Sequence, residues 1–130
     1  MPAEKIIKDK KILICDDDNE ILVFIWRFLK AEGYGNVDTS LNAEDALEKI
    51  KKTCYQLVLL GIRLQGIDGI QTLKRIKEVN TNIAVIMIAD PPHIEVAEEA
   101  VKSGAYDYIL KPVDLDQLKL IVLTKLLMDS

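Results

Sequence analysis

Four short apolar runs and one weaker run, which we expect nearer a sheet edge, are spread along the chain, and each is followed by a longer segment whose apolar residues have helical spacing. The runs fall at residues 11–15, 35–40, 57–60, 83–88 and 106–110, and the helical segments at 19–32, 42–52, 70–79, 93–103 and 114–128. Short, nearly continuous apolar runs are typical of strands buried on both faces. Five strand–helix units in succession predict an α/β fold, in which helices cover both faces of a parallel sheet.

The chain is long enough for one domain with a real core, and it contains no internal repeat or linker. We therefore expect a single domain over residues 1–130. Residues 1–10 carry only one apolar pair, and we expect them to form a frayed lead-in.

The central apolar run, Leu57 to Leu60, stops at Gly61. In an open α/β sheet, ligands bind just beyond the carboxyl ends of such central strands. Gly61 therefore occupies a position where a reactive side chain is expected, and glycine has none.

Three consecutive acids, Asp16, Asp17 and Asp18, follow the first strand. Adjacent carboxylates repel one another unless a cation lies nearby. Capping of the next helix explains Asp18 but neither of the acids before it. Asp90 lies one residue past another strand end, and we expect it to point away from the pocket.

Hydrophobic residues make up 49% of the chain and charged residues 29%, with a net charge of −4 and a pI near 5.0. This balance, with scattered basic residues, argues against nucleic-acid binding. The apolar runs are too short to cross a membrane, and the first residues lack the pattern of a signal peptide, so we expect a cytoplasmic protein. Cys15 and Cys54 lack metal-site spacing and are interpreted as reduced thiols.

Three segments together resemble the receiver domain of two-component response regulators: ILICDDDNEI, LVLLGIRLQGIDGI and GAYDYILKP. The resemblance covers nearly the whole chain. It implies a doubly wound (βα)5 sheet of strand order 2-1-3-4-5, the flavodoxin-like receiver fold, and a role in phosphorelay signalling.

The resemblance also implies roles for individual residues. Asp16 and Asp17 match the acidic pair that holds Mg²⁺ in the family. Lys111 matches the lysine that pairs with the phosphoryl group, and Tyr108 matches the aromatic switch residue. On this interpretation Mg²⁺ is the only cofactor, and we expect it to bind weakly.

Three positions depart from the family pattern. Gly61 stands where the family has its phospho-accepting aspartate, Ala89 where it has a serine or threonine, and Gln65 where it usually has proline. Phosphoryl transfer to this fold needs a carboxylate nucleophile, which Gly61 cannot supply. Asp16, Asp17 and Lys111 are then remnants of a phosphate pocket. Alternatively, they form only an electrostatic cluster, in which the lysine neutralises the two acids.

The first and last of the five helices, which the implied fold places side by side, carry more apolar residues than one buried face requires. We expect a partner surface on these helices, made by Val23, Trp26, Leu120, Leu123 and Leu127. A histidine kinase, an output domain or a second copy of the chain are the candidate partners. Alternatively, lysine stems cover these side chains.

Three functions remain open. The first is a pseudo-receiver that acts through protein contacts without phosphorylation, and the three departures favour it. The second is an ordinary receiver seen as a variant with Gly61 in place of the acceptor. The third is an enzyme using the same pocket, which is disfavoured because the only histidine, His93, lies on a distant loop and leaves no nucleophile–base pair.

Overall fold

A five-stranded parallel sheet of order β2-β1-β3-β4-β5 forms the centre of the molecule. The computed structural model describes residues 3–64 and 67–128. The strands are β1 (Lys11–Cys15), β2 (Asn36–Ser40), β3 (Leu57–Gly61), β4 (Ala84–Ala89) and β5 (Asp107–Leu110). The helices are α1 (Ala3–Lys8), α2 (Asn19–Ala31), α3 (Ala43–Lys52), α4 (Gly69–Val79), α5 (Ile94–Lys102) and α6 (Leu115–Met128), and a 3₁₀ turn at Pro91–His93 precedes α5. The predicted fold class and strand order are confirmed.

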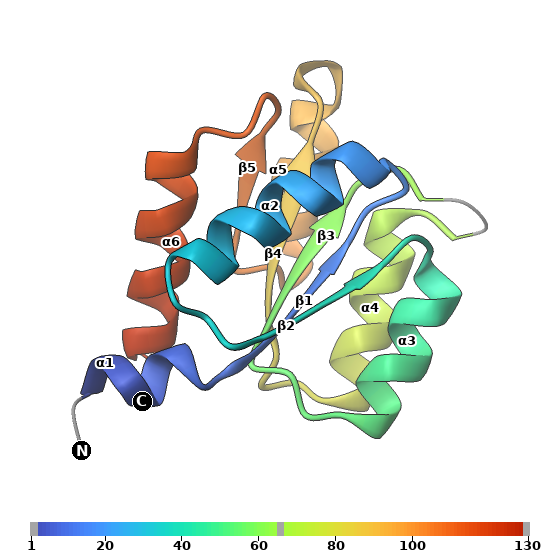
Figure 1. Ribbon diagram of the computed structural model, residues 1–130. Coiled ribbons are helices and arrows are strands. Elements are labelled where there is room, and N and C mark those ends of the chain that lie inside the picture. Colours follow the sequence, from blue (N-terminus) through green and yellow to red (C-terminus); the bar gives the residue numbers. More distant parts are fainter. Residues whose placement is uncertain (1–2, 65–66, 129–130) are drawn as a thin grey trace.

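Alternate residues of the central strands point to opposite faces of the sheet and build two cores. On one face, Leu13, Val58 and Val85 pack with buried residues of α3, α4 and α5. On the other face, Ile12, Leu59 and Ile86 pack with α1, α2 and α6. Figure 1 shows α2 and α6 on the same side of the sheet, as the sequence predicted. Because β1, β3 and β4 are covered on both faces, their interior residues are all apolar.

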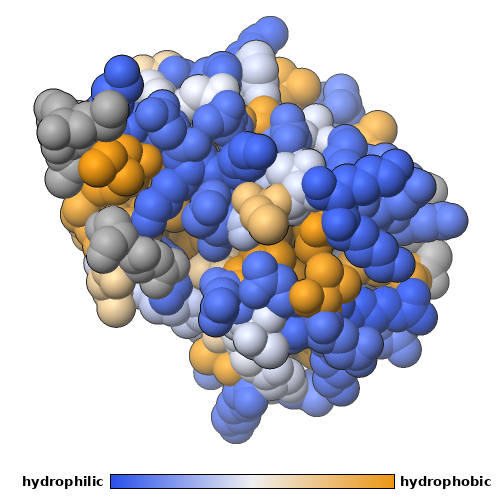
Figure 2. Space-filling view, turned by 90° about the horizontal axis from the view of Figure 1, so that it is seen from below, coloured by the Kyte–Doolittle hydropathy of each residue, from blue (hydrophilic) through white to orange (hydrophobic). Residues whose placement is uncertain are grey.

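Asp18, Asn42 and Asp68 cap α2, α3 and α4, where their side chains accept hydrogen bonds from backbone N–H groups. These caps fix where each helix starts relative to the preceding strand. They leave Asp16 and Asp17 at the carboxyl end of β1, next to the ends of β3 and β4. Figure 2 shows the opposite end of the molecule, whose surface is mostly hydrophilic with separate hydrophobic patches.

The expectation of a frayed lead-in at residues 1–10 is wrong for residues 3–8, which form α1. Ile7 is only 1% exposed and belongs to the core beneath α2 and α6. The helix was not predicted because its single apolar pair gives no periodic signal. Its stability comes from contacts with distant residues. None of the helices in the described ranges is long and apolar enough to cross a membrane.

Candidate functional site

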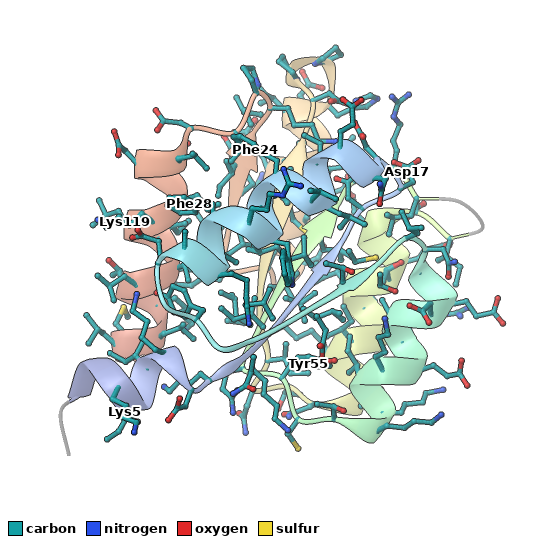
Figure 3. All side chains as sticks on the ribbon, in the orientation of Figure 1. Lys5, Asp17, Phe24, Phe28, Tyr55 and Lys119 are labelled. Carbon is teal, nitrogen blue, oxygen red and sulfur yellow. The ribbon has the colours of Figure 1, made fainter. Side chains whose placement is uncertain are left out.

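The carboxyl ends of β1, β3 and β4 surround a pocket of about 250 Å³. Its lining residues are Asp16, Asp17, Asp18, Ile62, Arg63, Ile88, Asp90 and Lys111. We call it the acidic pocket, because four carboxylates face two basic side chains. Figure 3 shows Asp17 at this end of the sheet, beside the start of α2. The pocket thus gathers three residues that the resemblance singled out: the two acids after β1 and the lysine after β5.

Asp16 is the most buried of these acids, with 1% exposure. Its Oδ1 accepts a hydrogen bond from Asp18 N at 3.0 Å, and its Oδ2 lies 3.2 Å from Lys111 Nζ. Within the described part of the chain, Oδ2 has an ion pair with Lys111 but no hydrogen bond of good geometry. Burial raises the pKa of Asp16 above its ordinary value, and the Asp18 N–H and the Lys111 ammonium partly oppose that rise.

Lys111 is oriented by the backbone after β5. Its N–H donates to Ala89 O at 2.8 Å, and this bond joins the end of β5 to the end of β4. Its side chain is 20% exposed and reaches the carboxylate of Asp16 at the far side of the pocket. The lysine therefore neutralises one buried negative charge in this structure.

Gly61 lies against Asp16 in a way that the sequence did not reveal. A Cβ atom on Gly61 would lie 2.9 Å from Asp16 Oδ2 and 3.2 Å from Asp16 Cγ. Contacts below about 3.0 Å are not tolerated by real Cβ atoms, so any other residue at position 61 requires the Asp16 side chain to move. The carboxylate of Asp16 thus occupies the space beside the glycine.

Ala89 and Tyr108 stand near the same end of the sheet. Ala89 is the last residue of β4 and is 1% exposed. Tyr108, in β5, is partly buried against the core that α3, α4 and α5 cover. Gln65 lies outside the described residues.

Asp90 and Arg63 were not expected in the site. Asp90 lines the pocket, so the expectation that it points away is wrong, and its Oδ2 lies 3.6 Å from Arg63 in a solvent-exposed ion pair. Asp90 follows the last residue of β4 as expected, but its side chain turns toward Arg63, which lies after β3 and also lines the pocket. The position of both residues just after central strands was the only signal in the sequence.

The donor atoms suit a hydrated magnesium ion better than a protein-enclosed one. No group of three or more acidic, histidine or cysteine side chains that could hold a metal is found among residues 3–64 and 67–128. Mg²⁺ commonly binds through one or two carboxylates and keeps several waters. The carboxylates of Asp16 and Asp17 fit that mode, since Asp16 Oδ2 is a buried oxygen without a hydrogen bond.

The proposed partner residues are distributed over two helices. Val23 and Trp26 on α2 are 36% and 37% exposed, and Leu120 and Leu127 on α6 are 67% and 47% exposed. Leu123 differs from the expectation, because it is partly buried against the core. At 100° per residue it lies about 60° around the helix from the buried Leu126, at the margin of the buried stripe.

Comparison with known proteins gives a consistent family. The model of the response regulator receiver domain matches residues 12–123. The transcriptional regulatory protein ZraR of Klebsiella oxytoca is 41% identical over 109 residues, which are 84% of this chain and 24% of that protein. Sporulation initiation phosphotransferase F of Bacillus subtilis is 33% identical over 111 residues, covering 85% of this chain and 89% of that protein.

Solved structures agree with these matches. NtrX from Brucella abortus superposes with a TM-score of 0.86 at 36% identity, over 91% of this chain and 27% of that one. The receiver domain of the Francisella response regulator 1452 gives 0.83 at 28% identity, over 94% of this chain and 100% of the other. The chain spans about a quarter of the length of the ZraR proteins that it matches.

Proposed function

The chain belongs to the response regulator receiver domain family, whose members are two-component signalling modules rather than conventional enzymes, and we propose that this member signals through protein contacts without accepting a phosphoryl group. The observation that carries the proposal is Gly61 at the carboxyl end of β3. The only oxygen that a glycine offers there is its backbone carbonyl, which cannot form an acyl phosphate.

The position of Asp16 supports the same proposal. Its carboxylate lies beside Gly61 and is paired with Lys111, so the lysine that would neutralise a phosphoryl group already has a partner. The pocket therefore contains a complete ion pair, Asp16 with Lys111, without a phosphoryl group. A carboxylate in this buried place also has a raised pKa, which makes it a poorer anion than an exposed aspartate.

Ala89 lies where a receiver would detect its own phosphorylation. The resemblance places a hydroxyl at this position, where it would bond a phosphoryl oxygen. Ala89 has none, and it is fully enclosed at the end of β4. We infer that Tyr108 serves here as a packed strand residue. As a switch residue it would respond to phosphorylation, but position 61 has no acceptor carboxylate and position 89 has no hydroxyl.

A second candidate is an ordinary phospho-accepting receiver seen as a variant with Gly61. Gly61 alone is compatible with it. Ala89 weighs against it, because a single replacement of the acceptor leaves the hydroxyl position unchanged. Residual Mg²⁺ binding by Asp16 and Asp17 is compatible with both candidates. We expect it to be weak, because no three acidic, histidine or cysteine side chains in the described part of the chain are placed to hold one metal ion together.

We place the contact surface on the exposed apolar residues of α2 and α6. Exposed apolar side chains that gather on neighbouring helices often mark a surface that contacts another protein. Phe24 adds to it at 44% exposure, and Figure 3 shows Phe24 and Phe28 on α2, with Phe28 near α6. A hollow on α2 that reaches Leu115 of α6 is lined by Val23, Phe24 and Phe28, and also by the polar or charged residues Asn19, Glu20 and Arg27. The occupant we propose is a protein, whether a kinase, an output domain or a second copy.

The test is exposure of the protein to acetyl phosphate with Mg²⁺, followed by intact-mass measurement. We expect no added phosphoryl group, while a receiver that retains its acceptor aspartate, treated in parallel, gains one. A stoichiometric, base-labile adduct on this chain would overturn the proposal, and peptide mapping would then show whether Asp17 or Asp90 carries it.

A further inference from the structure

Helix α1 lies outside residues 12–123, the stretch that the receiver family model matches. It has only six residues, and a helix of that length is not stable in water by itself. Figure 1 shows α1 beside the C-terminal end of α6, just before β1. Contacts with the rest of the molecule must therefore hold it.

One apolar side chain anchors the helix. Ile7 is 1% exposed and belongs to the same core cluster as Leu29, Tyr34 and Leu126. Its neighbour Ile6 is 46% exposed. Two adjacent isoleucines thus have opposite environments, which makes them a matched pair for experiment.

Two lysines then reach the C-terminal ends of two different helices. Lys8 Nζ donates to Glu32 O at 2.6 Å, at the end of α2, and lies 4.0 Å from the centre of the Tyr34 ring. Lys10 Nζ donates to Leu126 O at 2.9 Å, in the last turn of α6. The last carbonyls of a helix lack partners within the helix and attract cations, so both contacts are favourable.

Backbone hydrogen bonds extend the attachment to β2. Gly35 N donates to Lys8 O at 3.0 Å, and Asn36 Nδ2 donates to Asp9 O at 2.7 Å. Residues 3–10 therefore contact the end of α2, the start of β2 and the end of α6. In the described residues, the segment 3–10, which is α1 and the two residues after it, joins the C-terminal ends of α2 and α6 through one buried side chain and two charges.

We propose that residues 3–10 form a clamp that holds the C-terminal ends of α2 and α6 in place, and that its release loosens α6. The first part rests only on the contacts above. We propose as a second part that this loosening changes protein binding; it rests on the proposed function, because the partner surface is placed on the same two helices.

The test uses the full chain and backbone hydrogen exchange. We expect Ile7→Asp to speed exchange of the amides in the last turns of α6 and α2 by about tenfold or more, with little change in β3 and β4. Ile6→Asp is the matched control and should leave both regions unchanged.

A second pair of variants covers the case in which Ile7→Asp unfolds the whole protein. The double variant Lys8→Gln and Lys10→Gln removes both charges and leaves Ile7 in the core. Its control is Lys5→Gln, since Lys5 is exposed and points away from the body of the molecule (Figure 3). Faster exchange confined to the ends of α6 and α2 supports the clamp.

In the double lysine variant, unchanged exchange at these ends, or an equal increase in every strand, would overturn the clamp. Exchange is measured without a partner, so this result is independent of the proposed function. Partner binding or self-association, measured on the same variants, tests the second part separately.

Discussion

Replacement of Lys111 by methionine tests whether the buried charge pair stabilises the fold. The substitution keeps most of the aliphatic stem and removes the ammonium 3.2 Å from Asp16 Oδ2. Removing one partner of a fully buried pair costs about 3–5 kcal/mol, and leaving one buried polar atom unsatisfied costs about 1–3 kcal/mol. Lys111 is 20% exposed, and Asp16 keeps its bond from Asp18 N. We therefore expect a loss of about 1–3 kcal/mol in the free energy of unfolding at neutral pH.

The pH dependence follows from the raised pKa of Asp16. Burial raises it above 3.8, so the folded state binds this proton more tightly than the unfolded state does. The cost of the ionised carboxylate is therefore absent below pH 3.8 and grows as pH rises through the folded-state pKa. Loss of Lys111 raises that pKa further. The difference between the variant and the parent protein should be largest at neutral pH and shrink on acidification.

Urea unfolding at several pH values measures this difference, and thermal midpoints should fall by roughly 4 °C per kcal/mol for a domain of this size. Lys52→Met is the control, because Lys52 and Glu48 form an exposed pair at 3.8 Å that should contribute little. Mg²⁺ should partly restore the Lys111 variant. Equal stabilities of the two variants at neutral pH would show that the pair is solvated and refute the reasoning.

Two further predictions follow from the same geometry. Gly61→Asp should lower the stability of the protein without Mg²⁺, because the new side chain meets the Asp16 carboxylate. Adding Mg²⁺ should raise the thermal midpoint of this variant more than that of the parent protein. Equal shifts of the two midpoints would contradict this prediction. Leu120→Glu combined with Leu127→Glu should keep the fold, since both are exposed, and abolish self-association or partner binding in size-exclusion and pull-down measurements. Leu126→Glu, at a position with 0% exposure, is the control that should unfold. If the double variant unfolds as well, Leu120 and Leu127 belong to the core and the prediction is wrong.

The sheet was predictable mainly because its three central strands, β1, β3 and β4, are buried on both faces and therefore appear as apolar runs. Residues 57–60 and 83–88 predicted β3 and β4 to within one residue at each end, and capping by Asp18 was correct. The convergence of Asp16, Asp17 and Lys111 followed from their places after parallel strands, combined with the family resemblance. Local pattern and topology sufficed for these features.

Other features depend on contacts that no local pattern encodes. Helix α1 is held by Ile7 and two lysines against residues more than twenty positions away, so its short sequence looked unstructured. Leu123 lies at the margin of a buried stripe, where a small rotation of α6 decides its exposure. The position of Asp90 after β4 was predictable, but the direction of its side chain depends on the contact with Arg63.

The position of Asp16 beside Gly61 indicates that the glycine is part of how the Asp16 side chain packs. A glycine at the end of β3 leaves room for a neighbouring side chain. Here the Asp16 carboxylate fills that space so closely that even a Cβ atom would lie 2.9 Å away, and Lys111 supplies its counter-charge. The glycine and the Asp16–Lys111 pair are thus a single arrangement, in which restoring an acceptor at position 61 disturbs the pair.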